Sequence, residues 1–360
     1  MPSSTRLPLE AQTAYAELLT TLLVRRHEGR AATIVEKTIG GRVYLYVQER
    51  ALGGMRQSYL GSDTPEVRAR AEALRAGWAD QRADRERRAL LVKLARTAGC
   101  ATPTPAELKL LETLAHGALF AMGGVLVGTH AFAALMNALG VAADVASVRT
   151  GDVDLVHDPR MLVALVDAPL LPKLTSEGVD GLKLWPIPGF DPRSPSTSFL
   201  VHGSRLRLDL LTPMRGRSTS PVHIAALGAS ATPLRFLDYL VAESQPGAIV
   251  GAAGVLVNLP DPARFALHKL VVAEERHAAF ATKSRKDRLQ AETLLDVLLE
   301  DRPDDVRAAW DDLAGRGSGW TKRALRSLAQ LDAGVRERLL ALTTPQTASR
   351  RGRRIPEREG

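Results

Sequence analysis

Residues 148–156, VRTGDVDLV, place two carboxylates one residue apart in an otherwise apolar run. In a β-strand successive side chains alternate between two faces, so Asp152 and Asp154 would point the same way, opposite the aliphatic side chains. Like charges held this close repel each other. The run therefore predicts a strand with one buried apolar face and one acidic face that something must neutralise. An Asp-x-Asp pair alone also arises by chance at strand ends and in loops.

A second run, SRLRLDLL at 204–211, alternates in the same way and places Arg205, Arg207 and Asp209 on one face. If the two strands are neighbours, three carboxylates converge on one side of a sheet. Hard Mg²⁺ or Mn²⁺, completed by substrate phosphates, suits such an oxygen ligand set. Two ions about 4 Å apart can then serve a phosphoryl displacement. The two arginines have two open readings: they grip phosphates, or they neutralise the acidic cluster.

Upstream, GGVLVGTHAF provides a glycine turn that leads into a helix. The backbone N–H groups of such a turn, with the Thr129 hydroxyl, form a cradle for phosphates. Gly123 and Gly128 have the spacing of P-loop glycines, but Thr129 and His130 stand where that motif needs Lys followed by Ser or Thr. A P-loop is therefore excluded, and a different phosphate-binding turn is expected.

These stretches, VGTHAF, RTGDVDL and RLDLLTP, together resemble the polymerase-β-type nucleotidyltransferase superfamily. Their spacing is similar to its bacterial branch of abortive-infection and toxin–antitoxin nucleotidyltransferases. The resemblance covers about 105–300 and implies an NTP substrate, two divalent ions, an acceptor such as tRNA or a protein, and an antitoxin partner. His130 departs from the pattern, where small or apolar residues are common. The resemblance assigns nucleotide binding to Gly128, Thr129, Arg149 and Lys269, metal binding and catalysis to Asp152, Asp154 and Asp209, and a supporting role to Lys286 and Asp287.

The helical part of this resemblance, PARFALHKL followed by KSRKDRLQAETLL, raises a geometric problem. In one continuous helix, Lys269 and Asp287 would share a face but lie about 27 Å apart along the axis. Either the helix breaks between them, or Asp287 acts away from the reacting phosphate. Without the resemblance, Lys269 reads equally well as an exposed helical lysine.

The expected fold class is α+β, with a nucleotidyltransferase-type mixed β-sheet core and flanking helices. Residues 8–28 read as an amphipathic helix, and 40–61 as a β-hairpin. Thr64-Pro65 and Thr104-Pro105 begin helices, the latter with the capping box TPAE. The predicted domains are an accessory helix, hairpin and helix module at 1–100, a nucleotidyltransferase core at 101–220, a mainly helical domain at 221–345 and a disordered basic tail at 346–360.

Composition narrows the class of protein further. The formal net charge of +8 favours polyanionic partners, although a coding bias toward Arg produces the same surplus. The single cysteine, Cys100, and the lack of a signal-peptide core suit the cytoplasm. Residues 117–140 are long and uncharged enough to resemble a membrane span, but three glycines interrupt them. A strand, a turn and a buried helix explain this segment better, so no membrane partner is expected.

The sequence thus predicts a metal-dependent enzyme that transfers a nucleoside monophosphate from an NTP to an acceptor hydroxyl. One alternative is a nucleotidyltransferase fold without catalysis that binds nucleic acid or a partner. Another is a glycosyltransferase that holds a metal and a nucleotide diphosphate by Asp-x-Asp. The first hundred residues do not supply the parallel sheet that a glycosyltransferase needs ahead of that motif.

Overall fold

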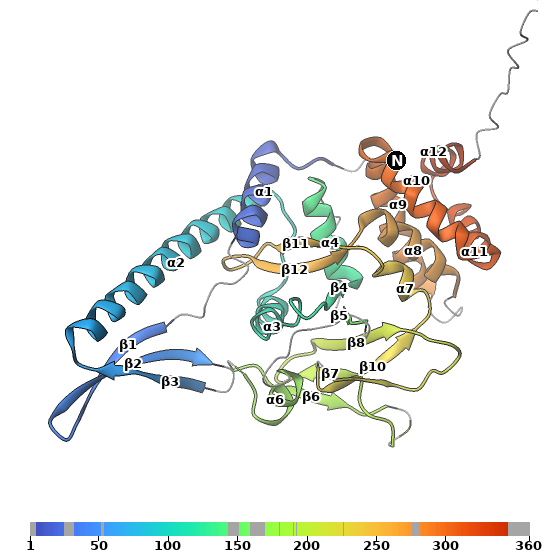
Figure 1. Cartoon of the computed structure of the whole chain (residues 1–360). Coiled ribbons are helices and arrows are strands. Elements are labelled where there is room, and N and C mark those ends of the chain that lie inside the picture. Colours follow the sequence, from blue (N-terminus) through green and yellow to red (C-terminus); the bar gives the residue numbers. More distant parts are fainter. Residues whose placement is uncertain are drawn as a thin grey trace, which may run out of the picture.

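The computed structural model describes residues 5–24, 32–51, 54–142, 151–158, 170–179, 181–189, 191, 193–225, 227–275 and 281–344. The predictions for Arg149 and for the tail at 346–360 lie outside these residues. The fold is a mixed α+β structure, as expected from the sequence, with helices around a mixed sheet (Figure 1).

The N-terminal region contains a long helix that leads from a small sheet to the rest of the molecule (Figure 1). Thr64 caps the long helix as predicted, because its side chain accepts a hydrogen bond from the N–H of Val67. The predicted hairpin is present, but a third antiparallel strand pairs along it, which the sequence reading had missed. The elements are α1 (Leu9–Val24), β1 (Ala32–Ile39), β2 (Arg42–Ala51), β3 (Gly54–Ser62) and α2 (Pro65–Thr97).

The central sheet is assembled from strands distant in the sequence. Its path runs β4 (Val125–Val127), β5 (Asp152–Val156), β8 (Arg207–Pro213), β10 (Ala229–Leu234) and β9 (Val222–Ile224). The β5–β8 and β8–β10 pairs are parallel. Strands β6 (Leu184–Ile187) and β7 (Ser198–Val201) join beside the first half of β8. The sheet therefore continues past residue 220 through β9 and β10.

Helices α3 (Pro105–His116), α4 (Gly128–Ala138) and α6 (Leu170–Ser176) accompany this sheet. The capping box at the start of α3 is confirmed: Thr104 and Glu107 exchange hydrogen bonds between side chain and backbone. Within 117–140 the chain forms turns, β4 and α4 rather than one long helix. In the part of the chain that the structure describes, no helix is long and apolar enough to cross a membrane.

The C-terminal region combines a two-stranded sheet with helices. These elements are α7 (Leu237–Leu240), β11 (Ser244–Ile249), β12 (Val255–Pro260), α8 (Pro262–Glu275), α9 (Ala281–Asp301), α10 (Pro303–Gly315), α11 (Ser318–Leu328) and α12 (Ala333–Thr343). The stretches PARFALHKL and KSRKDRLQAETLL lie on two separate helices, α8 and α9. The two helices pack against each other.

One hydrophobic core extends from α3 through the central sheet to α12. Val153 and Leu155 of β5 and Leu208 and Leu210 of β8 are almost completely buried in it. These are the residues that alternate with the acidic ones. The apolar face of the sheet thus fixes the backbone whose other face carries the carboxylates. A second, smaller core joins α1 and α2 to β11.

Candidate functional site

The acidic residues of β5 and β8 lie side by side. The two strands are neighbours, as the sequence predicted, and their parallel register pairs Asp154 with Asp209 and Asp152 with Arg207. Residues paired across a sheet point to the same face, so three carboxylates and one guanidinium gather there. Asp154 is also level with Val127, the last residue of β4, so the group lies where β4 passes into α4.

Gly128, the first residue of α4, touches the carboxylate of Asp154. Its φ is +68°, and a Cβ built on it would lie 2.2 Å from Asp154 Oδ2. Only glycine meets both the backbone conformation and the close approach. The N-cap residue of α4 is Val127, whose side chain makes no capping hydrogen bond, and Thr129 in the first turn is buried. The predicted glycine turn therefore adjoins the acidic pair, with helix N–H groups available for an anion.

Arg207 lies among the carboxylates. Its Nη2 is 3.3 Å from Asp152 Oδ1 and 2.9 Å from Asp209 Oδ2, and its Nε donates to the same Asp209 oxygen at 3.1 Å. These contacts favour the neutralising reading of this arginine. Arg205, which the alternation placed beside it, is exposed. The structure thus separates two residues that the sequence could not distinguish.

The electrostatics of the site remain strained despite Arg207. Burial raises the pKa of Asp154 to about 6, and the neighbouring charge of Asp209 adds to the rise. Lys269 and Arg207 oppose it less strongly. The other oxygen of Asp209, Oδ1, is buried and has no hydrogen-bond partner among the residues that the structure describes. Carboxylates in this condition are ready to accept a cationic ligand.

The break between α8 and α9 settles the position of the two helical residues. The two helices pack against each other, so that Lys269 Nζ donates to Asp287 Oδ1 at 2.6 Å. In one continuous helix these two residues would lie far apart along the axis. Asp287 is buried and Lys269 is mostly shielded from solvent. Lys286 lies near the same site: burial lowers the pKa of its ammonium, Lys269 lowers it further, and Asp287, Asp152 and Asp154 act in the opposite direction.

Sequence reasoning noted His130 only as a departure from a family pattern. The structure buries it, with Nε2 3.7 Å from Glu107 Oε1 of α3. Burial lowers the pKa of His130, and Glu107, Lys286 and Asp152 act on it more weakly. The available signal was its position two residues after Gly128 in an apolar helix. Glu107, the neighbour of His130, is also the capping-box residue of α3.

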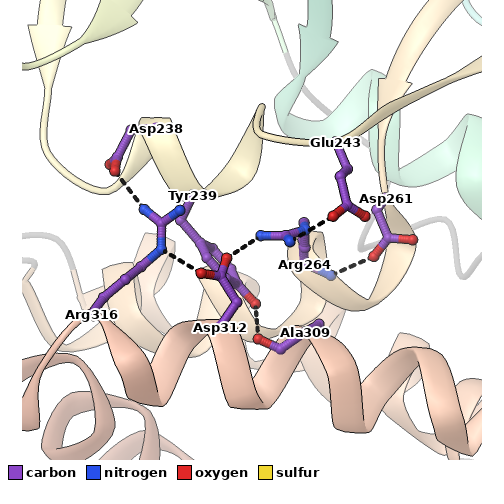
Figure 2. Close-up of polar contacts among 8 residues, drawn as sticks. All are labelled: Asp238, Tyr239, Glu243, Asp261, Arg264, Ala309, Asp312 and Arg316. Atoms are coloured by element: carbon purple, nitrogen blue, oxygen red, sulfur yellow. Dashed lines mark hydrogen bonds and ion pairs between the residues drawn. The ribbon is translucent and has the colours of Figure 1, made fainter.

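A second missed residue is Arg264 of α8, which anchors the helix that carries Lys269 (Figure 2). Its guanidinium donates to Glu243 Oε1 at 2.8 Å and also to Asp312 of α10. It packs on the ring of Tyr239, whose hydroxyl donates to the carbonyl of Ala309 at 2.9 Å. The signal was an arginine inside the apolar stretch PARFAL.

Arg316 completes this anchor from the other side of the ring (Figure 2). It donates to Asp312 and to Asp238 of α7. Ion pairs of buried arginines hold their geometry closely when each donor is satisfied. The network therefore fixes α7, α8 and α10 relative to one another, and with them the start of the helix that reaches the site.

The donor set can be tested against a divalent cation. Asp152, Asp154 and Asp209 offer only oxygen ligands, and one of these oxygens is buried and unpartnered, which suits Mg²⁺ or Mn²⁺. Among the residues that the structure describes, no group of three or more His, Cys, Asp or Glu side chains is drawn together closely enough to hold a metal. The oxygen ligands fit a hard ion. In the structure the positive charge beside Asp152 and Asp209 is that of Arg207.

Comparison with known proteins gives one match. A protein-family model described as nucleotidyltransferase matches residues 107–315, more than half of the chain. The matched range includes α4, β5, β8, α8 and α9, and therefore every carboxylate and lysine of the site. No curated protein and no solved structure matches the chain.

Proposed function

Because the chain belongs to the nucleotidyltransferase family, we propose that it transfers a nucleoside monophosphate from an NTP to an acceptor hydroxyl and releases pyrophosphate. The observation that carries the proposal is the placement of Asp154. It is paired with Asp209 across the sheet and lies against Gly128 at an uncapped helix N-terminus. Carboxylates and phosphate-binding N–H groups thereby face the same small space.

Each part of the site has a role in this proposal. Gly128 and Thr129 bind the triphosphate through the first N–H groups of α4. Lys269, held by Asp287, presents a fixed positive charge near Asp154, and Lys286 adds a second. Both reduce the repulsion between the carboxylates and the incoming phosphates. Asp209, whose Oδ1 is buried without a partner among the described residues, would accept the proton of the attacking hydroxyl.

Asp152, Asp154 and Asp209 would hold Mg²⁺ or Mn²⁺, as two ions. Bound there, the ions would stabilise the charge on the attacking and leaving oxygens of an in-line displacement. In the structure Arg207 contacts two of these carboxylates. Its single positive charge offsets part of their negative charge.

Label transfer tests the proposal. The variant with Asp152→Asn and Asp154→Asn should lose all transfer from α-labelled NTP to RNA or protein, because both metal-binding carboxylates are removed. Asp311→Asn is the matched control, since Asp311 is an exposed aspartate of α10. Thermal unfolding of each variant shows that the fold is kept. Transfer retained by the double variant would refute this site, and each of the four NTPs should be assayed to identify the base.

The resemblance to abortive-infection and toxin–antitoxin nucleotidyltransferases supports a narrower version of the proposal. In that version the acceptor is tRNA or a protein hydroxyl, and an antitoxin controls the enzyme. Incubation with labelled NTP and separate RNA and protein fractions identifies the acceptor by the fraction that becomes labelled. Growth arrest on expression, absent from the double Asn variant, would support the toxin role, and normal growth would count against it.

A further inference from the structure

The small N-terminal sheet presents a face rich in tyrosine. The rings of Tyr46 and Tyr59 meet edge to face with centroids 5.5 Å apart, and Tyr44 lies 6.2 Å from Tyr59. The ammonium of Lys37 lies 5.1 Å from the centre of the Tyr46 ring. Tyr59 is 59% exposed, unusually high for a tyrosine within an aromatic cluster. We call these four side chains, with Arg42, the tyrosine face.

The strand register explains why these residues share one face. Lys37 is paired with Tyr44, and Tyr46 is paired with Tyr59. The intervening residues point the other way, toward α2. Leu45 is 1% exposed there, and Glu36 of that side forms an ion pair with Arg68 of α2. The tyrosine face is thus the outer side of the sheet, away from the helix that supports it.

The polar groups of this face are cationic or neutral. Lys37 and Arg42 carry positive charge, and Gln48 and Gln57 form an amide chain with Lys37. Among the described side chains on this side of the sheet, none is a carboxylate. Ile39, paired with Arg42, is 55% exposed. A surface with one exposed ring, two half-buried rings and two cations, in a chain of formal charge +8, complements a polyanion that also has flat apolar groups.

We propose that the tyrosine face binds single-stranded nucleic acid. Unstacked bases can lie on the tyrosine rings, and Lys37 and Arg42 can contact the phosphates that join them. A duplex keeps its bases stacked on each other and cannot use the rings in this way. The binding does not depend on nucleotidyl transfer. If the acceptor of the proposed reaction is RNA, however, this face would hold part of it while another part reaches the carboxylates.

The test is equilibrium binding by the full chain without NTP. Fluorescence anisotropy with a labelled single-stranded RNA of mixed sequence and about 20 nucleotides should show salt-dependent binding. Tyr59→Ala should weaken binding by about tenfold through loss of one stacking partner. Tyr59→Phe keeps the ring and should bind within about twofold of the wild type. Because Tyr59 is exposed, thermal unfolding should be unchanged in both variants.

The charged residues provide an independent arm. Lys37→Ala should reduce the slope of the logarithm of affinity against the logarithm of salt by about 1. Lys322→Ala is the matched control, because it removes the same charge from an exposed position on α11 in the C-terminal region. It should leave the affinity unchanged. Equal losses in the two variants would indicate diffuse attraction to net charge and would overturn the assignment to the tyrosine face.

Single-stranded DNA of the same sequence distinguishes the two sources of this chemistry. Equal binding supports stacking without contacts to the 2′-hydroxyl, and tighter RNA binding supports RNA as the ligand. Duplex bound as tightly as single strand would overturn the proposal, as would Tyr59→Ala with wild-type affinity. Absence of any oligonucleotide binding would also overturn it. None of these results depends on transfer activity, so the proposed reaction can fail separately.

Discussion

Replacing Gly128 by alanine would disturb the candidate site where the proposed phosphate-binding turn lies against Asp154. The new methyl carbon would lie 2.2 Å from Asp154 Oδ2, whereas ordinary contact begins at 3.4 Å. One of the two groups must therefore move by about 1 Å. Because α4 and β5 both have buried faces in the same core, the carboxylate is the group that gives way.

Two effects of the substitution can be estimated separately. Alanine at a φ of +68° costs about 1 kcal/mol of stability in the left-handed region. A displacement of about 1 Å in a group that positions the reacting atoms can lower the rate about 100-fold. We therefore expect Gly128→Ala to remain folded while its kcat for nucleotide transfer falls about 100-fold.

The assay is transfer from α-labelled NTP, measured beside the free energy of unfolding in urea. Gly216→Ala is the matched control, because Gly216 has a φ of +67° and no atom within 4 Å of its built Cβ. It carries the same backbone strain without the contact. It should lose about the same stability and keep its activity.

Two results would refute this reasoning. If Gly128→Ala retains the wild-type kcat, the contact with Asp154 does not position a reacting group. If Gly128→Ala and Gly216→Ala lose activity equally, backbone strain accounts for the loss and the contact does not. Loss confined to Gly128→Ala, at similar stability of the two variants, would locate the effect at the carboxylate.

Three further predictions concern the charges of the site. In EDTA, Asp154→Asn should stabilise the fold by up to about 3 kcal/mol at pH 8, because burial and the charge of Asp209 raise the pKa of Asp154 to about 6. The ionised form is the costly one, so the gain should vanish as the pH falls to 4, which urea unfolding at both pH values would show. Arg207→Gln should tighten Mg²⁺ binding about tenfold in calorimetry, because it removes a positive charge beside the carboxylates. Unchanged Mg²⁺ affinity with weaker NTP binding would instead indicate that Arg207 contacts a phosphate. Lys269→Met should cost about 3 kcal/mol by removing the ion pair of a buried carboxylate, and Asp287→Leu in the same chain should restore stability without restoring transfer.

The acidic face of the sheet could be predicted because its signal is local. Alternation with a period of two assigns Asp152, Asp154 and Asp209 to faces without knowledge of the partner strand. The caps at Thr64 and Thr104 are local in the same sense, since each needs only its next three residues. The structure confirms both the shared face of the strands and the two helix caps.

The missed features depend on contacts between distant segments. Strand β1 alternates only weakly between apolar and polar residues, so its own sequence does not predict it. It forms by pairing with β2 along its whole length. From 263 to 295 the sequence contains no Gly or Pro, so nothing in its composition predicts that α8 and α9 pack side by side. The ion pair of Lys269 and Asp287 depends on this packing of α8 against α9, so the sequence alone could not predict it.

The distribution of strain in the molecule supports a functional reading of this face over a structural one. On the apolar face, Val153 and Leu208 are fully buried in the hydrophobic core. On the opposite face, Gly128 adopts a left-handed conformation, burial raises the pKa of Asp154, and Asp209 keeps a buried oxygen without a partner. A sheet selected only for stability would place apolar or paired residues there. The two carboxylate features are unfavourable, lie at one point and have a well-packed core behind them, as the proposed site for a cation and phosphates would require.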